Sequence, residues 1–180
     1  VAPGSIAYYC AVHNAFGMIG TIVVLPPPLF PGSGEDFNQG SAVNSPGLLP
    51  YQPITYGGGY DVKFAAGGQM LTVQARSIFG AFNYMPLLLV GQFFTSGQSA
   101  PPGALPGLYV NASGGFVIVN GLDPGPLGGF QVVVPGGSTY GFLVPAGLGG
   151  YSIMIQSLAI TGTAANGFFA ISDGLEVMLF

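Results

Sequence analysis

Hydrophobic and polar positions alternate in short runs along most of this chain, and Gly, Pro, Asn or Asp separates the runs. The runs are rich in Val, Ile, Phe, Tyr and Leu, which is typical of half-buried strands. Hardly any window of a dozen residues lacks Gly or Pro, and the helix formers Glu, Lys and Arg are nearly absent, so we predict no long helix. The pattern therefore predicts an all-β protein.

Strands are predicted wherever such a run lies between turn signals. The predicted strands are 6–10, 21–25, 60–65, 70–78, 87–94, 108–110, 116–119, 130–134, 139–144, 151–160, 168–172 and 175–180. The strongest hairpin signals are Asn166-Gly167 and Asp173-Gly174, because both dipeptides favour the positive φ angles of tight turns. We expect an antiparallel, jelly-roll-like β-sandwich rich in Gly and Pro.

Composition divides the chain into three predicted parts. Residues 1–25 contain two strands and end at Pro26-Pro27-Pro28, where three successive residues lack an N–H and cannot continue a ladder. Residues 26–59 are mostly Pro, Gly, Ser and Asn with few apolar anchors, so we predict a linker. Residues 60–180 carry the remaining strands and form the predicted sandwich.

Charge is scarce in this chain. Charged residues make up 4% of the sequence, and the formal net charge is -4. Lys63 and Arg76 are the only basic side chains, so a nucleic-acid backbone or an anionic lipid surface would find almost no counter-charge. No apolar run is long enough to cross a bilayer without Gly or Pro, so we expect no membrane span.

Near the N-terminus, residues 8–24 carry Cys10, His13 three residues later and Met18 five residues after that, followed by a β-branched run. This segment resembles the C-terminal ligand loop and last strand of the plastocyanin-like cupredoxins. The resemblance implies that Cys10, His13 and Met18 are copper ligands, with thiolate and imidazole in the trigonal plane and the thioether axial. It covers only about the first 25 residues.

The same resemblance implies a second histidine from an upstream strand, but His13 is the only histidine in the chain. Three interpretations follow. The cupredoxin half belongs to a longer protein, another chain donates the missing strands and a ligand, or the loop persists as a metal-free hairpin.

Enzyme chemistry has little support in the sequence. A Ser-His-Asp triad would have to use His13, and no nucleophile-elbow motif is present, so we predict no enzymatic activity. Glu35 and Asp36 are interpreted as solvating a loop rather than binding a cation. Asn111-Ala112-Ser113 is a glycosylation sequon, but we favour a turn-forming role for Asn111.

Low surface charge and strand edges without Lys predict chains that cover their apolar faces with other protein. The chain begins at Val1 without a basic and apolar leader, which fits a removed signal peptide or a fragment. Residues 150–180 loosely resemble a terminal β-sandwich module of secreted bacterial proteins. The leading hypothesis is a secreted, non-enzymatic subunit of a homo-oligomer or filament at the cell surface or beyond. The alternatives are a copper-binding electron-transfer module fused to a binding domain, and a carbohydrate- or surface-binding sandwich.

Overall fold

The structure is a computed structural model that describes residues 4–9, 19–24, 29–44, 54–56, 62–124 and 129–180. These residues form strands and irregular connections, and no helix occurs among them, so the fold is all-β as predicted. The strands are β1 (Gly4–Tyr9), β2 (Ile19–Val24), β3 (Asn38–Asn44), β4 (Thr55–Tyr56), β5 (Val62–Ala65), β6 (Met70–Arg76), β7 (Leu87–Thr95), β8 (Gly115–Asn120), β9 (Ser138–Leu143), β10 (Tyr151–Ile160), β11 (Phe169–Ile171) and β12 (Leu175–Leu179).

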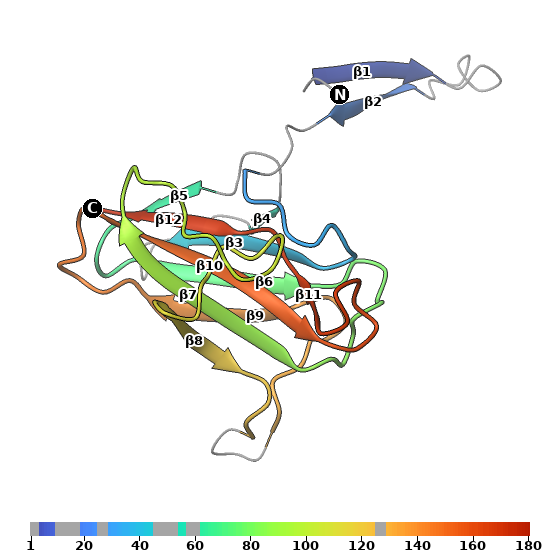
Figure 1. Ribbon diagram of the computed structural model, residues 1–180. Coiled ribbons are helices and arrows are strands. Elements are labelled where there is room, and N and C mark those ends of the chain that lie inside the picture. The colour runs from blue at the N-terminus through green and yellow to red at the C-terminus, as the bar shows by residue number, and fades with distance from the viewer. Residues whose placement is uncertain (1–3, 10–18, 25–28, 45–53, 57–61, 125–128) are drawn as a thin grey trace.

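The strands form three sheets. β1 and β2 pair antiparallel as a sheet of their own, with Tyr9 opposite Ile19. The six-stranded sheet has the order β5-β12-β10-β7-β8, and β11 also pairs with β10. The four-stranded sheet has the order β4-β3-β6-β9. Figure 1 shows the two larger sheets layered as a sandwich, with the β1–β2 hairpin drawn apart from them.

The main core lies between the two larger sheets. In β6, Leu71, Val73 and Ala75 are buried and alternate with half-buried residues, as expected of a strand with one face on a core. Leu71 and Val73 pack in one cluster with Leu89 of β7, Ile155 of β10 and three residues of β12, namely Leu175, Val177 and Leu179. A second cluster, around Phe37, Phe82 and Leu87, continues the core toward the loops after β6.

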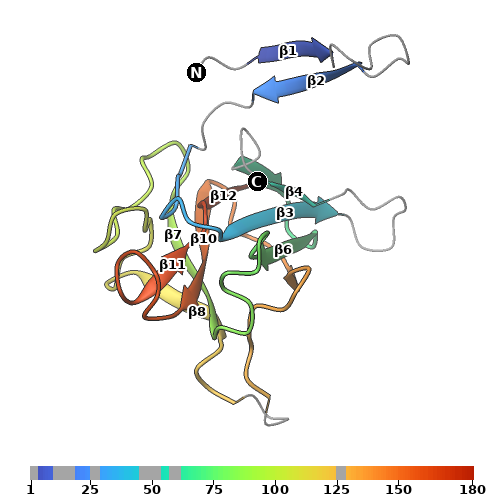
Figure 2. The ribbon, with the colours of Figure 1, turned by 90° about the vertical axis from the view of Figure 1, so that its right-hand side faces the viewer.

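The outer face of the six-stranded sheet is covered by loops. Phe30, Val110 and Met154 form a buried cluster there, and Phe30 packs edge-on against Tyr109 at 5.4 Å between ring centroids. Figure 2 shows these connections on the opposite side of the six-stranded sheet from β3 and β6. The sandwich therefore has three layers over much of its area: loops, the six-stranded sheet and the four-stranded sheet.

The prediction of a linker over residues 26–59 needs a correction, because β3 and β4 lie inside it. β3 pairs with both β4 and β6, and six of its seven residues are buried. Its sequence, Asn-Gln-Gly-Ser-Ala-Val-Asn, lacks the apolar alternation of an ordinary strand. Position between two neighbours, rather than hydrophobicity, makes it a strand.

The hairpin predicted at Asn166-Gly167 is confirmed, and the one predicted at Asp173-Gly174 is wrong. β10 and β11 run antiparallel on either side of the first dipeptide, and Gly167 has φ 75°. β11 and β12, however, both pair antiparallel with the same edge of β10. Asp173-Gly174 therefore joins two strands that run in one direction.

Two predicted strands, 108–110 and 130–134, are irregular in the structure. The backbone N–H groups of Tyr109 and Asn111 donate to the side chains of Gln156 and Gln92 instead of to a strand. Residues 130–134 contribute an isolated bridge from Val132 to Pro86, flanked by bonds from Leu87 N to Gln131 O and from Val133 N to Met85 O. The expectation of antiparallel pairing also has an exception, since β5 and β12 pair in parallel.

Candidate interaction surface

The loop between β6 and β7 is held in one conformation by a carboxylate from far away in the sequence. Asp36 accepts hydrogen bonds from the Ser77 hydroxyl at 2.5 Å, from the backbone N–H of Phe79 at 3.0 Å and from that of Ala81 at 3.2 Å. The Ser77 hydroxyl oxygen in turn accepts from the backbone N–H of Phe82 at 3.1 Å. This arrangement satisfies loop amides that no strand pairs, so Asp36 has a structural role in the loop.

The same hydrogen bonds set the ionisation of this carboxyl group. Partial burial raises the pKa of Asp36, but the bonds from Ser77, Phe79 and Ala81 outweigh burial and leave its pKa below 3.8. Asp36 is therefore ionised at neutral pH, and both of its oxygens can accept hydrogen bonds from the loop.

The loop also contains an unusual backbone conformation at Tyr84. Its φ is 65°, and it is the one non-glycine residue with positive φ in the described part of the chain. The backbone N–H of Tyr84 donates to Val133 O at 2.6 Å, which ties this strained residue to the segment before β9. An aromatic residue in the left-handed region costs conformational energy that the surrounding contacts must offset.

Three connections meet at this end of the sandwich. Besides the bond from Tyr84, Leu87 N donates to Gln131 O, Gly121 N donates to Leu87 O, and Ile160 N donates to Pro86 O. These bonds join the β6–β7, β8–β9 and β10–β11 connections side by side. Figure 1 shows them gathered at the end where β7 begins and where β8 and β10 finish.

Large hydrophobic side chains are exposed on these connections. We call this set the apolar end; its members are Ile78, Phe79, Tyr84, Leu122, Phe130, Val134 and Phe168. Phe79 is the most exposed of them, at 88%. Scattered exposed hydrophobics are ordinary on soluble proteins, but a gathering of this size at one end is typical of an interaction site.

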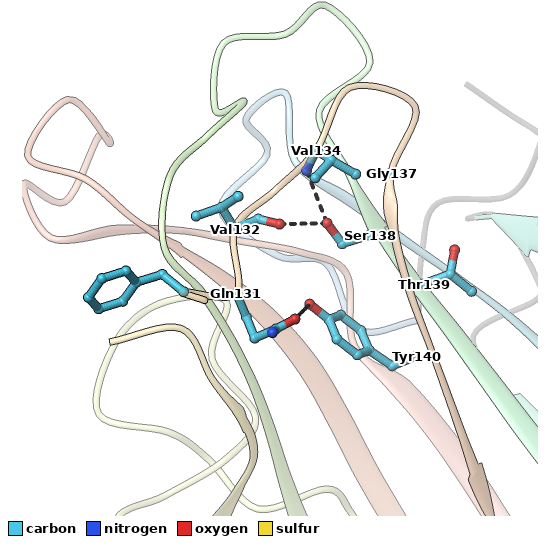
Figure 3. A pocket seen from close by; sticks show the side chains of 8 residues that line it. Gln131, Val132, Val134, Gly137, Ser138, Thr139 and Tyr140 are labelled. Atoms are coloured by element: carbon cyan, nitrogen blue, oxygen red, sulfur yellow. Dashed lines mark hydrogen bonds between the residues drawn. The ribbon is translucent and has the colours of Figure 1, made fainter. Parts of the chain in front are cut away.

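A shallow hollow of about 340 Å³ lies beside the apolar end, between residues 130–134 and β9. Figure 3 shows how Ser138 fixes its wall: the Ser138 hydroxyl donates to Val132 O at 2.7 Å and accepts from Val134 N at 3.0 Å. Tyr140 reaches the Gln131 side chain across the hollow at 3.2 Å. Burial raises the pKa of Tyr140, so its hydroxyl stays protonated and neutral.

A second hollow, of about 270 Å³, is nearly all apolar and lies on the outer face of β7 and β8. We call it the apolar hollow; its lining residues are Val90, Ala104, Leu108, Val110, Asn111, Ala112, Gly115, Phe116, Val117 and Leu158. The loop that forms one wall is anchored by Gln156, which donates to Gly107 O at 2.8 Å and accepts from Tyr109 N at 2.6 Å. The hollow is thus preformed rather than created by a moving loop.

β8 borders the apolar hollow and forms one edge of the six-stranded sheet. Its sequence is Gly-Phe-Val-Ile-Val-Asn, without a charged residue. Among the described residues it pairs with β7 alone, and most of its side chains are exposed or half-buried. The usual protection of an edge by Lys is missing here.

The predicted copper ligands Cys10, His13 and Met18 lie outside the described residues. The structure places β1 and β2 on either side of them as paired strands. Thiolate, imidazole and thioether donors suit copper, but this chain has no second histidine with which to complete the family's four-ligand set. Within the residues that are described, no group of three or more His, Cys, Asp or Glu side chains could hold a metal ion.

Asn111 lies in the wall of the apolar hollow and begins a turn. Its Oδ1 accepts from Ser113 N at 3.1 Å, from the Ser113 hydroxyl at 2.8 Å and from Gly114 N at 3.0 Å. These are the bonds of an Asx turn, the turn-forming role that the sequence favoured. Glu35 likewise supports a loop, accepting from Ala165 N at 2.9 Å.

Comparison with known proteins adds no family. No protein-family model, curated protein or solved structure matches this chain. In the part of the chain that is described, no helix has the length and hydropathy to cross a membrane.

The sequence analysis predicted neither the apolar end nor the apolar hollow. Phe79 followed by Gly80 was a visible signal, since this bulky apolar residue lies just after the predicted strand 70–78 and at a turn. The apolar hollow had no such signal, because its lining residues come from four separate segments of the chain.

Proposed function

We propose that this protein is a non-enzymatic, extracellular structural subunit whose copies associate with one another. The observation that carries the proposal is the apolar end, where three connections expose large hydrophobic side chains together. Burying such a surface against another protein is favourable by about 25 cal/mol per Å² of apolar area. A chain with few charges cannot use electrostatic repulsion to keep such surfaces apart.

The rigid construction of the apolar end supports the same proposal. Asp36 fixes the Phe79 loop, and Ser138 fixes the segment that carries Phe130 and Val134. Side chains on a fixed backbone lose less conformational entropy on association than side chains on a mobile loop. The uncharged edge at β8 provides a further unprotected surface.

Sedimentation velocity over a concentration series tests the proposal. We expect the sedimentation coefficient of the 180-residue protein to rise with concentration, and added salt to leave association intact because apolar burial drives it. A single monomer-sized species over the whole range, up to about millimolar concentration, would contradict self-association.

Copper binding by Cys10, His13 and Met18 is a second candidate. One observation favours it: the pairing of Tyr9 with Ile19 puts these three residues in a single connection between paired strands. The thiolate and thioether donors are suited to Cu(I), and a second histidine ligand would have to come from outside this sequence. We expect Cu(I) to be retained against a weak competing chelator by the wild type and released by Cys10→Ser, with Met70→Leu as a matched control. Equal retention by the wild type and Cys10→Ser would exclude a site at this loop.

A further inference from the structure

We propose that copies of this protein associate through two different surfaces, with Phe79 of one copy seated in the apolar hollow of the next. We call the exposed Phe79 side chain the knob. This inference rests on the proposed self-association and names the two surfaces that meet. Phe79, the knob, lies in the connection between β6 and β7 and is not part of the lining of the hollow, so each copy can offer both at once.

Phe79 has the properties of a knob. Its side chain is 88% exposed, so it does not occupy the hollow of its own chain. Its backbone N–H donates to both carboxylate oxygens of Asp36 at 3.0 Å, which fixes the base of the side chain. Ile78 and Tyr84, in the same connection between β6 and β7, are also exposed and add to its apolar surface.

The apolar hollow has the matching size and chemistry. Its volume is about 270 Å³, whereas a cavity of about 150 Å³ lined by Leu, Ile and Phe already accepts benzene. A phenyl ring therefore fits with room for part of a neighbouring side chain. Asn111 is the one polar side chain in the lining, and its Oδ1 is engaged in its own turn, so the hollow offers an apolar guest little competition from polar groups.

Electrostatics does not oppose the contact. None of the residues that line the hollow is charged, and neither Ile78, Phe79 nor Tyr84 carries a charge. Asp36, beneath the knob, has its carboxylate oxygens engaged by Ser77, Phe79 and Ala81. The contact would therefore place no charged side chain of the hollow or of the knob between the joined surfaces.

The geometry of the contact determines the type of assembly. A knob on one surface and a hole on another make a heterologous contact, which repeats from copy to copy instead of closing as a two-fold dimer does. Such a contact gives open chains of subunits or, where the rotation allows, rings. The proposed structural subunit would therefore form a filament-like series.

Two variants that each remove one surface test this inference. Phe79→Ser removes the knob but keeps the hollow, and Val117→Asp puts a charge into the hollow but keeps the knob. We expect each variant alone to weaken association by about tenfold or more, as loss of a buried aromatic anchor does. The matched controls are Phe180→Ser and Leu143→Asp, which change exposed hydrophobics elsewhere and should assemble like the wild type.

Mixing the two variants gives the decisive result. Phe79→Ser still has an intact hollow, and Val117→Asp still has an intact knob. We therefore expect a complex that contains one copy of each variant and does not grow further, which sedimentation velocity would detect. Circular dichroism and urea unfolding check that each variant is folded. If Val117→Asp does not fold, Ala104→Phe fills the hollow from its exposed rim instead.

The outcomes separate this inference from the proposed function. Wild-type association that persists in Phe79→Ser, or a mixture of folded variants that forms no complex, would overturn the knob and hollow while leaving self-association in place. A wild type that stays monomeric at every concentration would overturn self-association itself.

Discussion

The Ser157 hydroxyl of β10 donates a hydrogen bond to Gln39 Oε1 of β3 at 2.5 Å, joining the two sheets through the middle of the core. The Gln39 amide nitrogen donates to Ile155 O at 3.1 Å, so both ends of this buried side chain are engaged. Ser172 adds a longer contact to the same oxygen at 3.5 Å. This polar junction sets the position of β3, a strand with little apolar character, against the six-stranded sheet.

Replacing Gln39 with Ala should destabilise the protein by about 2–3 kcal/mol, because the Ser157 hydroxyl loses its acceptor and Ile155 O loses a donor in the core. Urea unfolding measures the loss as a lower midpoint with an unchanged slope. Gln98→Ala, at an exposed position, is the control and should change stability by less than about 0.5 kcal/mol. Equal midpoints for Gln39→Ala and Gln98→Ala would show that the junction contributes nothing.

Asp36→Asn should loosen the loop that carries Phe79. The amide keeps the size of the carboxylate, but it is neutral and has one acceptor oxygen for three donors. We expect the free energy of unfolding to fall by only about 1 kcal/mol, because the site is close to solvent. The effect on local opening of the loop should be larger. Hydrogen exchange at Phe79 and Ala81 should become faster. Unchanged exchange at both amides would contradict the structural role of Asp36.

The contribution of Asp36 should depend on pH in a defined direction. Its pKa is lower in the folded protein than the ordinary value of 3.8. The unfolded chain therefore binds the proton more readily, and the stabilisation is complete above that ordinary value and is lost as pH falls through the lower, folded pKa. The difference in unfolding midpoint between the wild type and Asp36→Asn should stay constant from neutral to mildly acidic pH and shrink in stronger acid. A difference that disappears well above pH 3.8 would contradict this.

Tyr84→Gly should leave the stability unchanged or raise it slightly. Relief of the left-handed conformation at φ 65° contributes about 1–2 kcal/mol, and the extra backbone entropy of Gly costs roughly 0.5–1 kcal/mol. Tyr84→Val should instead destabilise, since a β-branched side chain tolerates positive φ least. Thermal unfolding of the two variants compares them directly, and the idea fails if Val is tolerated better than Gly.

Gly121→Ala should destabilise by about 3 kcal/mol through steric overlap with the backbone. A Cβ atom at Gly121 would lie 2.3 Å from Gln131 O and 2.5 Å from Leu87 N and O. Neither neighbour can move without breaking the bonds that join the connections at the apolar end. Gly129→Ala, where nothing lies within 4 Å of the added atom, is the matched control. Similar melting temperatures for the two variants would refute this close approach.

Local patterns were sufficient to predict most of the strands. β6, β7, β9, β10 and β12 lie where runs of Val, Ile, Leu, Phe and Tyr lie between turn residues, because a strand with one face on a core needs such residues at alternate positions. Asn166-Gly167 was predictable for the same kind of reason, since a positive φ at Gly167 needs only local geometry. The candidate surface was not predictable in this way, because its parts come from separated segments.

The sequence by itself determined that this chain is all-β, that it is almost uncharged and that Cys10, His13 and Met18 lie close together along it, because residue type and spacing are local properties. Only the tertiary structure decided that polar β3 lies buried between β4 and β6. It also decided that Asp173-Gly174 joins two strands that run in the same direction, and that Phe79 is exposed. Burial and exposure depend on which distant segments cover a residue. Those neighbours are set by the packing of the sheets and loops, which no local pattern contains.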